Sequence, residues 1–212
     1  MSAVELVKVS KNYGLLPALK DISLTVDEGE AVAFLGPNGA GKSTILRIVA
    51  SQIRPTSGDI RVLGHSLSEE PLAVKRMVGL VGHKSFLYDE LTVEENLRYY
   101  GRFFDATSDD IDRVIKVTDL QRWRDFQNRH LSHGLKKRAD IARAMLGRSR
   151  ILVLDEIFSG LDQASSDNLI EHLTGSQGLT ILVSSHSLEL VRRLCDRGIH
   201  LRGGEIEKDV TL

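Results

Sequence analysis

Two segments that lie far apart in the chain carry residue types suited to phosphate chemistry. The first, residues 36–43, reads Gly-x-x-x-x-Gly-Lys-Ser. Glycines at this spacing let backbone N–H groups converge on phosphate oxygens, and a helix that follows presents its N-terminus to the anion. We expect Lys42 to reach the β- and γ-phosphates and the Ser43 hydroxyl to ligate Mg²⁺. The nucleotide-binding candidates are Gly36, Pro37, Asn38, Gly39, Ala40, Gly41, Lys42, Ser43 and Thr44.

The second segment, residues 151–156, ends the apolar run Ile-Leu-Val-Leu with two carboxylates. Such a run predicts a strand covered on both faces, and ligands of open α/β sheets bind at the carboxyl ends of the strands. We expect Asp155 to hold Mg²⁺ through water and Glu156 to polarise an attacking water. Both segments fit an ATPase or a small-molecule kinase, whereas the sequence has no Asn/Thr-Lys-x-Asp segment for reading guanine.

Strand and helix patterns around these segments predict one α/β domain over residues 1–212. A nucleotide-binding core (1–83 and 151–212) would be interrupted by a helical subdomain (about 84–150), in which Thr92 and Glu95 form a capping box. A final hairpin is expected around Gly203-Gly204. Strands are predicted at 4–9, 22–26, 30–35, 151–155 and 179–186, and helices at 41–52 and 187–195.

Composition limits the classes of protein that remain. The chain has 212 residues and a net charge of −1, which disfavours a dedicated nucleic-acid binder. The single cysteine, Cys195, excludes an internal disulfide and is expected to be a small core residue. Since no apolar run approaches the roughly 18 residues of a membrane span and the first residues lack an apolar signal-peptide region, we expect neither feature.

Four further stretches resemble motifs of the ATP-binding cassette (ABC) family. Leu-Ser-His-Gly at 131–134 is similar to the signature motif, and Phe-Ser-Gly-Leu-Asp, ending at Asp162, is similar to the D-loop. His186 occupies the position of the switch histidine, and Tyr13 that of the aromatic residue that stacks on adenine. The resemblance implies a P-loop NTPase core with an N-terminal antiparallel β portion and a helical signature subdomain.

The same resemblance implies a head-to-tail pair of cassettes that sandwiches ATP. Ser132, His133 and Gly134 would contact ATP held by the P-loop of the partner cassette, and hydrolysis would use Glu156 and His186 together with Lys42. The implied partners are a second cassette and an integral membrane permease, without nucleic acid. The implied location is the cytoplasmic face of the cell membrane, with peripheral attachment through the permease.

Several positions depart from the usual family pattern. His133 stands in place of a glycine, Leu135 in place of a glutamine, and Ile157 in place of a proline. His83 stands at the Q-loop position, which usually holds a glutamine. Together with Leu-Thr-Val-Glu-Glu-Asn-Leu at 91–97, that histidine is similar to the ATPase subunit of the haem exporter of cytochrome c maturation.

Three alternatives stay open. The chain could serve an ABC-2-type exporter of another cargo, such as a drug, lipid or polysaccharide. It could be a degenerate cassette that binds ATP and hydrolyses it slowly. A non-transport cassette acting on nucleic acid or ribosomes is a further possibility, although such proteins usually carry a coiled-coil insert or tandem cassettes.

Overall fold

The computed structural model describes residues 1–82, 84–147, 149–175 and 178–212, and the strands of this part form two sheets. The larger has the order β10-β9-β3-β8-β7-β6. All neighbours in it are parallel except the β9–β10 hairpin. Its strands are β3 (Ala31–Leu35), β6 (Val78–Val81), β7 (Ile151–Asp155), β8 (Thr180–Ser184), β9 (Arg197–Arg202) and β10 (Glu205–Thr211).

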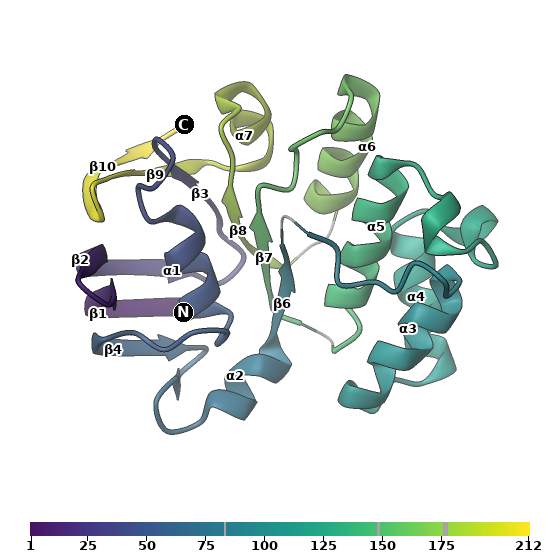
Figure 1. Cartoon of the computed structure of the whole chain (residues 1–212), viewed down its shortest axis with the longest axis horizontal. Coiled ribbons are helices and arrows are strands. Elements are labelled where there is room, and N and C mark those ends of the chain that lie inside the picture. The colour runs from purple at the N-terminus through teal and green to yellow at the C-terminus, as the bar shows by residue number, and fades with distance from the viewer. Residues whose placement is uncertain (83, 148, 176–177) are drawn as a thin grey trace.

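The larger sheet is covered on both faces, which explains the continuous apolar runs of its central strands. In β3, Val32 and Phe34 point into one apolar cluster, whereas Ala33 and Leu35 point into another. The first cluster contains α1 (Lys42–Val49), and the second contains parts of α6 (Gln163–Thr174) and α7 (Leu188–Leu194). Figure 1 shows α1 and α6 on opposite sides of the strands.

The smaller sheet is antiparallel and packs on the side of α1. Its order is β2-β1-β4-β5, and apolar residues of β1, β2 and β4 join α1 in one cluster. Figure 1 shows α1 between the two sheets. The strands are β1 (Ser2–Tyr13), β2 (Leu16–Asp27), β4 (Ser57–Val62) and β5 (His65–Ser66).

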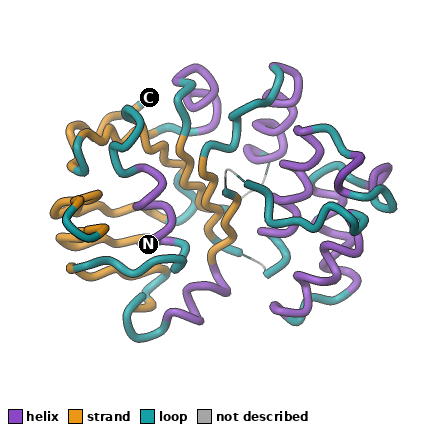
Figure 2. The backbone as a smooth tube through the Cα atoms, viewed as in Figure 1, coloured by secondary structure: helices purple, strands orange, loops and turns teal. Residues whose placement is uncertain are grey.

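A helical region with its own apolar cluster lies beyond β6 (Figure 2). Thr92 starts α3 (Val93–Gly101) with the predicted capping box, and Thr107 starts α4 (Ser108–Val117) in the same way. The third helix of this region, α5 (His133–Ala144), also contacts β6. Short 3-10 turns at Arg102–Phe104, Gln121–Trp123 and Asn128–His130 link them, and α2 (Pro71–Met77) precedes β6.

The α/β fold class with an antiparallel β portion and helices is confirmed. The final hairpin turns at Gly203 and Gly204, whose φ angles of 57° and 85° favour glycine. Cys195 is buried, as expected. The strands predicted at 4–9 and 22–26 extend much further, because β1 and β2 continue as a hairpin in which polar and apolar residues alternate less regularly.

Candidate functional site

The glycine-rich loop connects the end of β3 to the start of α1. Gly36 has a φ of 138°, and a Cβ there would lie 2.2 Å from the Leu201 carbonyl oxygen, so only glycine fits. Lys42 is buried in the first turn of α1, and its Nζ donates to the carbonyl oxygens of Gly36 (2.8 Å) and Pro37 (3.1 Å). The loop therefore curls around the Lys42 ammonium group, which keeps this cation beside the backbone that an oligophosphate would approach.

Asp155 ends β7 beside the glycine-rich loop. Its Oδ1 accepts hydrogen bonds from the Ser43 Oγ (2.8 Å) and from the Ser184 Oγ (2.7 Å). A hydroxyl on α1 thus meets a buried carboxylate on the sheet. These hard oxygen donors fit Mg²⁺, which binds one or two carboxylates together with substrate phosphates. Arg47 is 3.9 Å from the other carboxylate oxygen.

Glu156 and His186 face each other across the ends of two neighbouring strands. The His186 Nε2 lies 3.1 Å from Glu156 Oε1, and the His186 side chain is half exposed. Glu156 has a φ of 54°, a conformation that a non-glycine residue holds only when its surroundings fix it. The backbone N–H of Glu156 donates to the Ser184 carbonyl (3.2 Å) and to the Ser184 Oγ (3.0 Å).

Lys42, Ser43, Glu156 and His186 line one cavity of about 510 Å³, a size typical of small-ligand sites. The cavity brings together nine residues predicted from the sequence and adds Ala18 and Ser159, while Ser184 supports the site through its hydrogen bonds to Asp155 and Glu156. Sequence reasoning missed Ser184, although it is the last residue of a buried strand and pairs in register with Asp155. The lining consists of Ala18, Asn38, Gly39, Ala40, Gly41, Lys42, Ser43, Thr44, Glu156, Ser159 and His186.

Other predicted site residues lie away from this cavity. Among the residues described, its lining includes neither Tyr13 nor the signature residues 132–134. Tyr13 ends β1, is 48% exposed, and has its ring centroid 5.3 Å from the Lys11 ammonium. Asp162 caps α6 by accepting from the Ser165 N–H (2.7 Å), and this hydrogen bond lowers its pKa. His83 is outside the described residues.

The signature residues form the exposed start of α5. The Ser132 Oγ accepts from the Leu135 N–H (3.3 Å) and caps the helix. The ring of His133 extends sideways, with its Nε2 3.2 Å from the Ser159 carbonyl oxygen. Gly134 faces α6, where a Cβ would lie 2.8 Å from the Ser165 Oγ. The N-terminus of α5 therefore packs on residues 159–165 of the same chain, and residues 132–134 do not line the cavity of that chain.

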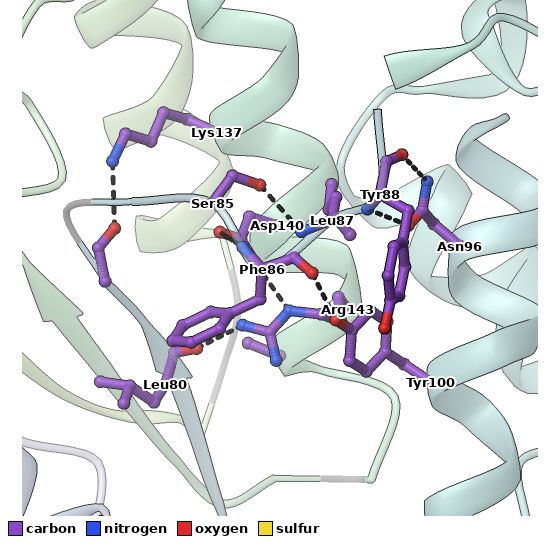
Figure 3. A network of polar contacts seen from close by, with 12 residues as sticks. Leu80, Ser85, Phe86, Leu87, Tyr88, Asn96, Tyr100, Lys137, Asp140 and Arg143 are labelled. Atoms are coloured by element: carbon purple, nitrogen blue, oxygen red, sulfur yellow. Dashed lines mark hydrogen bonds and ion pairs between the residues drawn. The ribbon is translucent and has the colours of Figure 1, made fainter. Parts of the chain in front are cut away.

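One face of α5 holds the segment that follows β6 (Figure 3). Lys137 donates to the Gly82 carbonyl (3.2 Å), Asp140 accepts from the Phe86 N–H (3.3 Å), and Arg143 donates to the Leu80 carbonyl. Residues 136–138 form a basic run, yet this run is not a fully solvated helix face. Lys137 is only 5% exposed, and burial lowers its pKa.

A family model and several known proteins match the sequence of this chain. Residues 19–159 match the family model described as ABC transporter. The ABC transporter ATP-binding protein NatA of Bacillus subtilis (strain 168) is 39% identical over 91% of this chain and 81% of its own length. The Nod factor export ATP-binding protein I of Rhizobium meliloti (strain 1021) is 36% identical over 95% of this chain. The chain spans only 62% of the length of that second relative.

Solved structures agree with this family. A dimeric post-hydrolysis state of the ATP-binding cassette MJ0796, bound to ADP and Pi, has a TM-score of 0.89 at 27% identity and covers 99% of this chain and 98% of its own. An ATP-binding subunit of an ABC transporter has a TM-score of 0.86 at 30% identity, over 99% of this chain and 90% of its own. Because the family model and the Bacillus relative both span most of the sequence, this chain belongs to the ABC transporter family, as a nucleotide-binding subunit that hydrolyses ATP to drive transport.

Proposed function

We propose that this chain is the ATPase of an exporter and works as a head-to-tail dimer with ATP at the interface. One observation carries the proposal. The cavity holds Lys42, Glu156 and His186, whereas the signature residues at the start of α5 lie outside it. A second cassette would bring its own α5 to the open side of this cavity, so that each site is completed by its partner.

Each residue then has a defined role. Lys42 would leave the loop carbonyls and bind the β- and γ-phosphates, while Mg²⁺ held by Ser43 and Asp155 would neutralise their charge. Glu156 would accept the proton of the attacking water, which His186 would hold in place. Tyr13 would stack on the adenine ring, and Asp162 would keep the D-loop at the start of α6.

The partner's signature would act on the γ-phosphate. Ser132 offers a hydroxyl, and Gly134 a backbone N–H in the first turn of α5, where the helix dipole favours an anion. Binding of ATP at both sites would close the dimer, and hydrolysis would open it. The proposed division into a core (1–83 and 151–212) and a helical subdomain (about 84–150) lets α5 approach the partner as a unit.

The proposed membrane partner is an integral permease, which would place the chain peripherally at the cytoplasmic face. No helix in the described ranges is long and apolar enough to cross a bilayer.

Tyr88, Tyr99 and Phe103 form an exposed aromatic patch in which neighbouring rings make edge contacts. Next to it, a groove lined by Leu72, Lys75, Arg76 and Phe103 joins apolar to basic residues. This surface suits an amphipathic permease segment with acidic residues.

For the cargo we propose haem export in cytochrome c maturation, on the resemblance carried by His83 and residues 91–97. Export of another cargo is the second candidate, and the name of the Rhizobium relative, which specifies Nod factor export, favours it. The two candidates differ in the permease and cargo that they require, and not in the chemistry of the cassette.

The ATPase proposal is tested with Glu156→Gln. Turnover should fall about 10²- to 10⁴-fold, which is the usual contribution of a general base. The variant should also form a stable dimer in the presence of ATP and Mg²⁺, detected by sedimentation. Glu171→Gln, an exposed change on α6, serves as the control and should behave like the unchanged chain. Unchanged turnover in Glu156→Gln would contradict the mechanism.

The transport proposal is tested by purifying the full chain with its native partners in mild detergent. A multi-span permease together with haem absorption and cytochrome c assembly proteins supports haem export. Another permease supports the second candidate. Recovery of ribosomes or DNA without a membrane protein would contradict both.

A further inference from the structure

His133 joins the signature helix to the segment that follows Glu156 in the same chain. Its Nε2 is 3.2 Å from the Ser159 carbonyl oxygen. A Cβ built on Gly160 would lie 3.4 Å from the same nitrogen, so the imidazole edge rests on the backbone at 159–160. A carbonyl oxygen can only accept, and therefore the imidazole donates its Nε2–H. The glycine usual at this position of the signature has no side chain and makes no such bond.

Ser159 belongs to the wall of the ATP site and is tied to Glu156. The Ser159 N–H donates to the Glu156 carbonyl (3.1 Å), which closes a turn over residues 156–159. Ile157 within that turn is fully buried in the core. The same turn holds Glu156 at its φ of 54°. A displacement of the Ser159 carbonyl would therefore shift the backbone of Glu156 and change the orientation of its carboxylate.

We propose that His133 is a positioning residue for hydrolysis at the ATP site of its own chain. The inference rests on the head-to-tail dimer of the proposed function. In that dimer the start of α5 meets the partner's ATP, whereas the Ser159 carbonyl lies beside the chain's own ATP. The His133–Ser159 hydrogen bond connects the start of α5 to the wall of the chain's own ATP site. Contact of the signature with the partner's nucleotide then fixes the turn that carries Glu156.

The geometry predicts which of the two sites a substitution at His133 impairs. A residue that acts through the signature contact would affect ATP bound to the partner's P-loop. A residue that acts through Ser159 would affect ATP bound to its own P-loop. His133→Gly removes the imidazole and leaves the Ser132 cap and the first turn of α5 in place.

Mixed dimers separate these two routes. In the first, a His133→Gly chain pairs with a Glu156→Gln chain, so the only competent Glu156 belongs to the chain that lacks His133. In the second, a chain with both substitutions pairs with an unchanged chain, so the competent Glu156 lies opposite the altered signature. Differently tagged chains allow both dimers to be isolated, and single-turnover hydrolysis of ATP is measured in each, against a dimer of unchanged and Glu156→Gln chains.

Single-turnover hydrolysis in the first dimer should be about tenfold slower or more, the scale on which a small misplacement of a reacting group acts. The second dimer should hydrolyse ATP at the rate of the reference dimer. His133→Gln, whose side-chain amide keeps an N–H donor, should restore most of the rate in the first dimer. His130→Gly changes a nearby exposed histidine and should leave both dimers unaffected.

The inference would be overturned if single-turnover hydrolysis slowed in the second dimer alone, slowed equally in both dimers, or slowed in neither. These results differ from failure of the proposed function. If Glu156→Gln alone formed no ATP-dependent dimer, that result would contradict the proposed head-to-tail arrangement and, with it, this inference.

Discussion

The Nε2 of His186 lies 3.1 Å from a carboxylate oxygen of Glu156, at the open end of the cavity formed by the glycine-rich loop. The two residues follow neighbouring parallel strands, β7 and β8, whose last residues Asp155 and Ser184 are in register. In the proposed mechanism the pair would place a proton acceptor and an imidazole beside the γ-phosphate of a bound nucleotide. This arrangement suits alignment of an attacking water more than it suits phosphate binding.

His186→Ala is therefore expected to separate hydrolysis from binding. Turnover should fall about 10²-fold because the water and Glu156 lose their alignment. The dissociation constant for ATP should change little, because the loop and Lys42 stay intact. Steady-state hydrolysis and equilibrium binding of a fluorescent ATP analogue check this. Weakened binding with unchanged turnover would contradict the assigned role of His186.

Ser184→Ala tests the support beneath Asp155 and Glu156. The hydroxyl donates to the Asp155 carboxylate and accepts from the Glu156 N–H, and it is fully buried. Removing it should lower the free energy of unfolding by about 1–3 kcal/mol and reduce Mg²⁺-dependent turnover. Ser185→Ala is the matched control, because the Ser185 hydroxyl accepts a local bond from the Ser187 N–H. Denaturant unfolding and ATPase assays should show larger effects for Ser184→Ala than for Ser185→Ala.

Glu94 makes the helical region sensitive to acid. A hydrogen bond from Arg124, assisted by Arg98, lowers its pKa to about 2. Its ordinary pKa is near 4.3, so this stabilisation is complete above that value and is lost as the pH falls towards about 2. Glu94→Gln should lower the free energy of unfolding by about 1 kcal/mol at pH 7, as for a partly exposed ion pair.

The unfolding difference between Glu94→Gln and the unchanged chain should shrink progressively below about pH 4. Glu69→Gln, an exposed change outside this network, is the control. A difference that stays constant between neutral and acid pH would contradict the assigned ion pair.

Cys195 should be unreactive in the folded chain. Burial raises the pKa of its thiol to about 12, so little reactive thiolate forms at pH 8. A thiol reagent should label it only after unfolding, as mass spectrometry can show. Rapid labelling of the native chain would mean that the helix end at α7 opens readily.

Phe103→Asp should weaken association with the permease. Phe103 is 62% exposed in the aromatic patch, so the change should leave folding and basal ATPase activity nearly intact. Val210→Asp, on the exposed edge strand β10, is the control. Recovery of the permease by affinity purification should fall for Phe103→Asp and not for Val210→Asp. Equal recovery with both variants would place the permease elsewhere.

The sequence by itself determined the family and the fold class, and it named candidate residues for the phosphate site. These follow from local rules, because a glycine-rich turn, an apolar strand and a capping box are encoded by contiguous residues. Gly36 to Thr44, Asp155 and Glu156 could thus be named without coordinates. The roles of these residues stay predictions, as do the roles of His83 and Tyr13 and the cargo.

Only the tertiary structure decided which distant side chains meet. Ser184 reaches Asp155 because β8 pairs with β7 in parallel register, which no local pattern specifies. Lys137 lies in a run that looks solvated, yet packing of α5 on β6 buries it against Gly82. The contact of His133 with Ser159 likewise depends on packing between α5 and the start of α6. Long-range packing sets these contacts, and it is fixed by the whole chain and not by any segment.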